Sequence, residues 1–270
     1  MQLCPGFCAG GIRACPDRRL GWLIRASVVF FTIVLLAGCD LPRDIEGTQD
    51  HVRNGLLRVG VIDGASPWAT WSGGEPQGVE TQLVRELAKR MGANIRWVSG
   101  SDTELFGALA AFELDVVIGG IERSSPWGKK VALTRPYHVT RIMLGWPPDQ
   151  PASEDLDKRR VAVKQNSSVA RRLAERGAVT VALEEGRDAR LPVAAAESQI
   201  LAWGLRPSPP VLETRKQVFA VPAGENGWLQ TVQRFLFEKR ADVPAMIRSE
   251  WSDPASNVSS HVRSKEVAVR

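Results

Sequence analysis

The cysteines and histidines, which often carry metal or nucleophilic chemistry, are few in this chain and poorly placed for it. All four cysteines lie in the first 39 residues, at Cys4, Cys8, Cys15 and Cys39. The remaining 231 residues can therefore form neither a disulfide nor a thiolate metal site. The first three cysteines match no zinc spacing. The histidines are far apart in sequence, so each is expected to be a surface or structural residue: His51, His138 and His261. We predict no metal and no cofactor.

Other residues have the chemistry to bind a small solute. Asp63 follows an apolar run at 57–61, and ligands favour the C-terminal ends of parallel strands; a simple turn aspartate is the alternative. Trp68 could hold a cation on its ring face, by about 0.5–2 kcal/mol, or pack in the core. Ser167 and Ser168 precede a predicted helix. Free amides at such a helix start suit a carboxylate, and the two serines could equally serve as helix caps.

Strands that alternate with helices are predicted to position these residues. A helix over 79–91 has apolar side chains on one face and charged ones, Glu80 among them, on the other. Ser101 or Asp102 can cap a short helix. The stretches 147–158 and 205–212 are expected to be connections. Alternating strands and helices predict parallel βαβ units and an α/β fold. The short apolar runs that predict strands are 57–61, 95–98, 115–118, 160–163, 179–183, 193–196 and 217–221.

The N-terminal segment has the pattern of a secretory signal. Four arginines precede an apolar run at 26–37, followed by Gly38 and Cys39. The run is shorter than the roughly 17–25 residues of a spanning helix, although an uncleaved N-terminal anchor is the alternative. Cys39 after Leu-Ala-Gly resembles the bacterial lipobox, which implies cleavage before Cys39 and a lipid on its sulfur. Asp40 resembles an inner-membrane retention signal. Residues 1–38 hold four arginines and one acid, so their removal lowers the net charge from +5 to +2.

The order of the motifs is similar to that of the family 3 extracellular solute-binding proteins, the amino-acid-binding components of ABC importers. The strand at 57–61 leads to Asp63 and then to Pro67-Trp68, where the family has "PPF". Gly78-Val79-Glu80 opens a helix, as the family's "GFD" does, and Pro136-Tyr137 matches "PY". The resemblance covers residues 55–252. It implies two α/β lobes of a type II periplasmic binding protein, each a mostly parallel sheet flanked by helices and joined by two hinge strands.

The resemblance also implies a division of the chain. Residues 1–38 are expected to be the signal peptide, and the polar residues 39–54 a lipid-anchored tether. Residues 55–142 and 213–252 would form lobe 1, and residues 143–212 would form lobe 2. Residues 253–270 are polar and are expected to be a disordered tail.

Carried over residue by residue, the family motifs imply further ligand contacts. Asp63 matches the lobe-1 acid, Ser168 a threonine of lobe 2, and Glu197 the aspartate that takes an amino group. Around Gly120, the family's Ser or Thr falls at Glu122 and its carboxylate-binding arginine at Trp127, which an indole cannot replace. Either Arg123 substitutes, or the ligand lacks an α-carboxylate. Asp63, Glu122, Glu197, Trp68 and Trp127 would then form an acidic, aromatic cleft suited to an amine; a degenerate or differently registered site is the alternative.

The function that the resemblance implies is a receptor. Composition is that of an ordinary globular protein, with 44% apolar and 24% charged residues, and the small charge excess excludes nucleic acid as a partner. We expect a periplasmic receptor, held at the inner membrane by a lipid on Cys39, that delivers an amino acid or amine-like solute to an ABC permease. It is not expected to be an enzyme. The alternatives are a cyclohexadienyl or arogenate dehydratase-like enzyme on the same scaffold, with Asp63, Glu122 and Glu197 as acid and base, and a sensing lipoprotein.

Overall fold

The computed structural model describes residues 44–72, 74–183 and 191–252. The expected signal peptide, Cys39 and the C-terminal tail 253–270 lie outside the described residues. Within the described ranges, no helix is long and apolar enough to cross a membrane.

The first sheet has the strand order β4-β1-β5-β12-β6. Its core is parallel, with β1 (Leu56–Ile62) between β4 (Asn94–Gly100) and β5 (Val116–Ile118). The short strands β12 (Ala220–Val221) and β6 (Ala132–Leu133) are antiparallel additions. The strands predicted at 57–61, 95–98 and 115–118 are therefore confirmed here.

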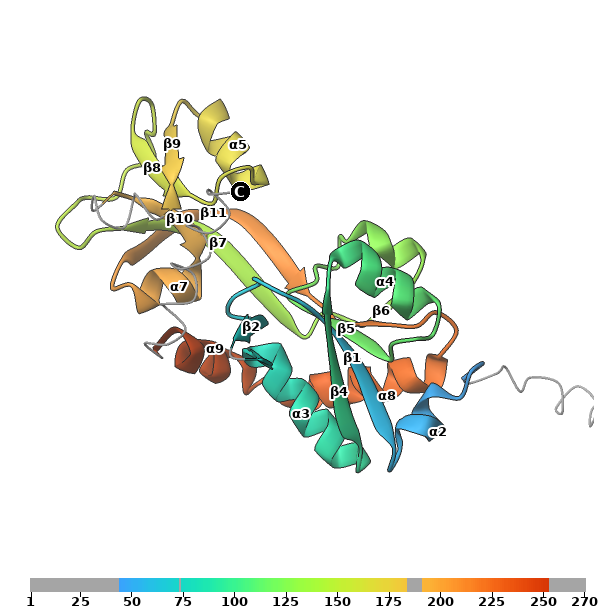
Figure 1. Cartoon of the computed structure of the whole chain (residues 1–270). Coiled ribbons are helices and arrows are strands. Elements are labelled where there is room, and N and C mark those ends of the chain that lie inside the picture. Colours follow the sequence, from blue (N-terminus) through green and yellow to red (C-terminus); the bar gives the residue numbers. More distant parts are fainter. Residues whose placement is uncertain (1–43, 73, 184–190, 253–270) are drawn as a thin grey trace, which may run out of the picture. The chain divides into compact units, whose positions relative to one another are not determined.

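The second sheet has the order β11-β7-β10-β8-β9. Strands β8 (Arg160–Val163), β9 (Val179–Ala182) and β10 (Val193–Ala196) are parallel and confirm the predicted strands. The chain enters this sheet through β7 (His138–Trp146) and leaves through β11 (Arg206–Gln217), which pair with each other antiparallel. Figure 1 shows these two strands running side by side. The predicted lobe boundaries fall inside β7 and β11, and the division into lobes stays a prediction.

The stretch 205–212 was wrongly expected to be a connection, since β11 covers almost all of it. The stretch contains Pro207, Pro209 and Pro210, and prolines usually mark a turn. β11 is an edge strand, however, where a missing backbone donor is tolerated. Its register against β7 shifts between Ser208 and Glu213, where the last two of these prolines lie.

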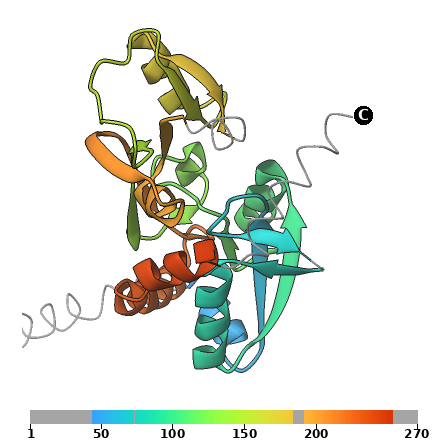
Figure 2. The same ribbon diagram turned by 90° about the vertical axis from the view of Figure 1, so that its left-hand side faces the viewer.

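Helices cover the first sheet and return the end of the chain to it. α3 (Val79–Met91) ends at Gly92, which has a φ of 67°, and α4 (Asp102–Ala110) begins with a capping box between Ser101 and Glu104, which confirms the predicted serine cap. α8 (Asn226–Lys239) and α9 (Val243–Ser252) contact α3 (Figures 1 and 2). Tryptophan, phenylalanine and aliphatic side chains of α3, α8 and the sheet form one buried cluster.

The remaining elements are α2 (Thr48–Val52), the hairpin β2 (Thr70–Ser72) and β3 (Glu75–Gln77), the 3₁₀ helix η1 (Pro126–Lys129), α5 (Ser168–Glu175) and α7 (Glu197–Ala202).

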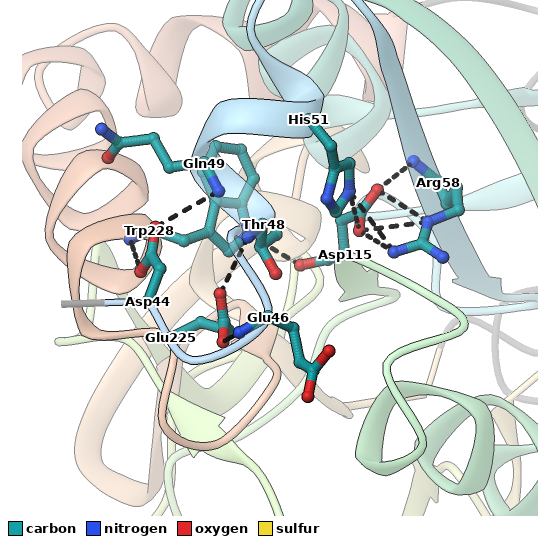
Figure 3. A network of polar contacts seen from close by, with 9 residues as sticks. All are labelled: Asp44, Glu46, Thr48, Gln49, His51, Arg58, Asp115, Glu225 and Trp228. Carbon is teal, nitrogen blue, oxygen red and sulfur yellow. Dashed lines mark hydrogen bonds and ion pairs between the residues drawn. The ribbon is translucent and has the colours of Figure 1, made fainter. Parts of the chain in front are cut away.

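The segment 44–54 was expected to be part of a polar tether, but it is packed against the first sheet's helices. The carboxylate of Glu225 accepts hydrogen bonds from the backbone amides of Glu46 (2.8 Å) and Thr48 (2.9 Å). In return, the Asp44 carboxylate accepts from the Trp228 amide at the start of α8 (3.0 Å). Figure 3 shows this reciprocal arrangement. The polar composition of this segment therefore did not reveal that it is packed. The acceptor for its amides, Glu225, lies about 180 positions later in the chain, where no local pattern indicates it.

Candidate functional site

A cavity of about 220 Å³ lies where the first strand–helix loop, the two linking strands and the second sheet meet. We call it the central cavity. Within the described part of the chain, its charged lining side chains are Lys164 and Arg215, both cationic. Hydroxyl and amide groups provide the other polar lining. Its lining residues are Ser66, Pro67, Trp68, Thr140, Ile142, Val163, Lys164, Ser167, Val169, Leu183, Ala194, Ala195, Ala196, Ser198, Gln199, Arg215, Gln217, Ile247 and Trp251.

Trp68 forms one wall of this cavity, and the start of α3 holds its loop in place. The carbonyls of Pro67 and Trp68 accept hydrogen bonds from the Val79 amide (3.0 Å) and the Glu80 amide (2.9 Å). These amides belong to the first turn of α3, where they have no partner within the helix. The indole is 7% exposed, so it serves both as cavity wall and as core. The core-packing alternative for Trp68 is confirmed, and its contact with a ligand stays a prediction.

Glu80 was wrongly placed on the outer face of α3, since its side chain is fully buried. One carboxylate oxygen accepts from the amides of Gly119 (2.6 Å) and Gly120 (3.0 Å), and the other accepts from the Tyr137 hydroxyl (2.5 Å). Burial raises the pKa of Glu80 above its ordinary value, and the hydrogen bonds from Tyr137 and the two glycines oppose that rise. Burial, together with the Glu80 charge, raises the pKa of Tyr137 well above its ordinary value. The signal was present in the sequence, because Glu80 stands at the acid of the family's "GFD" motif.

His138 lies at the start of β7 and packs against Trp68. The two ring centroids are 5.4 Å apart and tilted by 55°. Burial lowers the pKa of His138, so the neutral imidazole is favoured. The expectation that His138 is a structural residue agrees with this position.

The start of α5 reaches the central cavity through Ser167. Its hydroxyl accepts from the Ala170 amide (3.1 Å) and donates to the Lys164 carbonyl (2.7 Å), so the capping role is confirmed. The Ser168 hydroxyl is instead hydrogen-bonded to the Glu213 carboxylate. Ser167 and Ser168 also line a second, polar cavity of about 510 Å³, with Glu122, Glu213 and Arg215 among its other walls.

Arg215 on β11 lies at the border of these two cavities. Its Nε is 2.7 Å from Glu213 and 3.6 Å from Glu122. Burial alone would raise the pKa of Glu213. The hydrogen bond from the Ser168 hydroxyl and the charge of Arg215 favour the carboxylate, so the pKa of Glu213 is lowered overall. Arg215 is a cation that the motif comparison did not select, since the family's carboxylate-binding arginine aligns with Trp127. A period of two along β11 offers the only hint, because Arg215 and Gln217 face the same way.

The remaining expected contacts are placed elsewhere. Asp63 accepts a hydrogen bond from the Trp71 amide (2.7 Å), as a turn residue would. Trp127 stacks on Phe106 with ring centroids 5.0 Å apart, and Arg123 donates to the Leu133 carbonyl (3.3 Å). None of Asp63, Arg123 and Trp127 is among the residues that line the central cavity.

Glu197 faces a third cavity, of about 440 Å³, between β7, α7 and α9. There it accepts two hydrogen bonds from Arg141, at 2.8 and 2.6 Å. The expected acidic, aromatic cleft is therefore not assembled, because Asp63, Glu122 and Glu197 each have a local partner and lie in different places. Gly120 packs against Trp68, since a Cβ there would be 2.7 Å from Cδ1 of Trp68, but it is not among the residues that line the central cavity. Among the described residues, no group of three His, Cys, Asp or Glu side chains could hold a metal ion.

Comparisons with known proteins give the family. The family model of the bacterial extracellular solute-binding proteins, family 3, matches residues 57–253. A probable histidine-binding protein of Campylobacter jejuni is 24% identical over 119 residues, which are 44% of this chain and 46% of that protein. The chain thus matches less than half the length of this relative.

Solved structures support the fold. An ancestral cationic amino acid solute-binding protein superposes with a TM-score of 0.65 at 21% identity, over 76% of this chain and 98% of that one. The L-cystine solute receptor of Neisseria gonorrhoeae, in its unliganded open conformation, gives 0.60 at 18% identity, over 74% and 94%. These structures confirm the two-lobed, type II periplasmic-binding-protein fold. Since the family model covers most of the chain, this protein belongs to the bacterial extracellular solute-binding proteins, family 3.

Proposed function

We propose that this protein is a lipid-anchored periplasmic receptor that captures a small, carboxylate-bearing solute of the amino-acid class and delivers it to an ABC importer. The observation that carries the proposal is the central cavity, in which Trp68 from the first sheet's loop faces Lys164, Ser167 and Arg215 from the second sheet. The names of two relatives, a histidine-binding protein and a cystine receptor, support an amino acid as the solute.

The charges of the cavity favour a carboxylate over an amine. Lys164 and Arg215 line it, and the helix α5 begins directly beside it at Ser167. A helix start carries a partial positive charge and adds to the attraction of an anion. Arg215 already contacts Glu213 and Glu122, so Lys164 is the side chain that we assign to the solute carboxylate.

The arrangement of the walls explains how a solute would change the protein. A carboxylate at Lys164 and Ser167 contacts the second sheet, while the solute's body contacts Trp68 beside the first sheet. A ligand stabilises a closed form only as far as it binds that form better, and a solute that touches both walls does so. The closed form is then the state that a permease recognises. Nothing in this scheme requires a catalytic residue.

A matched panel of ligands tests the proposal. Thermal unfolding of the full chain in detergent is followed with the twenty L-amino acids, and with histamine, agmatine and cadaverine, which are histidine, arginine and lysine without the carboxylate. A bound solute at 100 times its Kd should add about 2.7 kcal/mol of stability. We expect a shift with at least one amino acid and none with its amine. Shifts with the amines alone would contradict the carboxylate assignment, and no shift at all would contradict the receptor.

Two variants make the test specific. Lys164→Gln should weaken binding of the amino acid, because it removes the charge that faces the carboxylate. Lys158→Gln is the matched control, since Lys158 precedes the same strand, β8, and its side chain is 90% exposed. For the anchor, a labelled fatty acid should be incorporated into the native protein and not into Cys39→Ser. Absence of the label from the native protein would contradict the lipid and favour an uncleaved N-terminal segment.

A further inference from the structure

We propose that Glu80 is the positioning residue of the central cavity. It couples a displacement of Trp68, when a solute binds, to the linking strands β7 and β11. This inference rests on the proposed function only in assigning a solute to the cavity. Glu80 itself does not line the cavity. It acts through three segments that meet at its carboxylate and at its backbone amide.

The first segment is the loop that carries Trp68. The Glu80 amide donates to the Trp68 carbonyl (2.9 Å), so the residue that offers the carboxylate also fixes the backbone of the cavity wall. Trp68 in turn lies edge-on to the Tyr137 ring, with centroids 6.1 Å apart. Glu80 therefore holds Trp68 in two ways: directly, through its backbone amide, and indirectly, through the Tyr137 ring, whose hydroxyl it binds.

The second segment is the turn after β5. Gly119 and Gly120 both point their amides at one carboxylate oxygen of Glu80. Both have a positive φ, 132° and 68°, and a Cβ on Gly119 would lie 2.5 Å from the Cβ of Ile62. The turn thus approaches its neighbours closely, and the Glu80 carboxylate accepts hydrogen bonds from both of its glycine amides. The same turn leads to Glu122, which faces Arg215.

The third segment is the entrance to the linking strands. Tyr137 directly precedes β7, and its amide donates to the Gln217 carbonyl at the end of β11 (3.1 Å). The Tyr137 hydroxyl donates to Glu80. A shift of Trp68 on solute binding would therefore move Tyr137 and, with it, the ends of both strands. A buried carboxylate with three donors is rigid because freeing any donor leaves a buried polar group unsatisfied.

A matched pair of variants separates positioning from general stability. Glu80→Gln keeps the shape of the side chain but has one amide group where the carboxylate had an oxygen. Glu225→Gln is the control: Glu225 is 1% exposed, belongs to the same body and also accepts from two backbone amides. Glu225 does not line the central cavity. Hydrogen exchange of the full chain is then measured by mass spectrometry, with and without the amino acid panel.

We expect Glu80→Gln to speed exchange in residues 65–69, 118–121 and 137–139 and to leave residues 44–52 as in the native protein. Glu225→Gln should do the reverse. Any panel amino acid that binds the native protein should bind Glu80→Gln about tenfold more weakly, because the wall must be ordered again on binding. Binding by Glu225→Gln should stay within about twofold, as for distant, independent sites.

Two results would overturn the proposal. One is native-like exchange of the three segments in Glu80→Gln. The other is an equal loss of affinity in Glu80→Gln and Glu225→Gln, which would show that general stability alone is affected. If no panel amino acid binds the native protein, the proposed function fails, and the exchange pattern still decides the role of Glu80.

Discussion

A single added methyl group at Gly120 should displace the tryptophan wall of the central cavity. Gly120 has a φ of 68°, and a Cβ there would lie 2.7 Å from Cδ1 of Trp68 and 3.3 Å from Cβ of Ala65. The first distance is too short for any real contact, so the indole must move. Gly120→Ala therefore combines a backbone cost of about 1–2 kcal/mol for a left-handed alanine with an overpacking cost of about 1–3 kcal/mol.

Gly204→Ala separates these two costs. Gly204 has almost the same φ, 69°, but a Cβ there would meet no heavy atom within 4 Å. The control pays the backbone cost alone, so the difference in the free energy of unfolding between the two variants isolates the displaced indole. Urea unfolding of both variants, with a check that their m-values agree, should place Gly120→Ala below Gly204→Ala by about 1–3 kcal/mol.

The same pair should differ in binding. Gly120→Ala should weaken binding of any amino acid that binds the native protein, and Gly204→Ala should not. Equal free energies of unfolding for the two variants would refute the reasoning, because they would mean that Trp68 and the turn at Gly120 are not packed as the structure has them.

Three further predictions follow from the same contacts. Glu225→Ala should lower the free energy of unfolding by about 1–3 kcal/mol, since one buried and one partly buried backbone amide lose their acceptor; unchanged urea unfolding would contradict the packed N-terminal segment. Because the pKa of Glu80 is raised in the folded state, its contribution to stability is complete below the unfolded pKa and is lost as the pH rises through the folded pKa. The stability of the native protein relative to Glu80→Gln should therefore fall as the pH rises from 4, and a rise would contradict the direction. Binding of a carboxylate solute through Lys164 should weaken with added salt, and in Lys164→Gln that salt dependence should be smaller.

The parallel cores of both sheets could be predicted from the sequence, whereas the linking strands could not. β5 and β10 are short, continuous apolar runs, and almost all of their residues are buried. β11 has an exposed edge and three prolines, so its composition is typical of a loop. Its pairing with β7 spans about 70 positions, and no local pattern encodes a partner at that distance. Sequence periodicity therefore missed both strands that join the two halves, as it missed the short strands β2, β3 and β6.

Burial of a charge is also invisible to helical periodicity. The face of α3 that carries Glu80 was assigned by polarity, yet the first turn of a helix is where a carboxylate can turn inward and meet backbone amides. Gly119 and Gly120 supply those amides from the end of another strand. A sequence pattern reports which side chains are charged, but it does not report which backbone donors elsewhere in the fold lack a partner.

The direction of side chains along β7 explains why the acidic cleft did not form. Successive residues of a strand point to opposite faces. Ile142 lines the central cavity, Arg141 lines the cavity beside α7 and α9, and Thr140 borders both. Arg141 is not among the residues that line the central cavity, and its guanidinium binds Glu197 in the cavity beside α7 and α9. Glu197 stands where the family has the aspartate that takes an amino group. Its carboxylate is nevertheless bound to Arg141 on the neighbouring strand β7. The same period of two on β11 turns Arg215 and Gln217 toward the central cavity. The position of an acid in a motif therefore does not determine which cavity its carboxylate lines, and the charged side chains that line the central cavity among the described residues are Lys164 and Arg215.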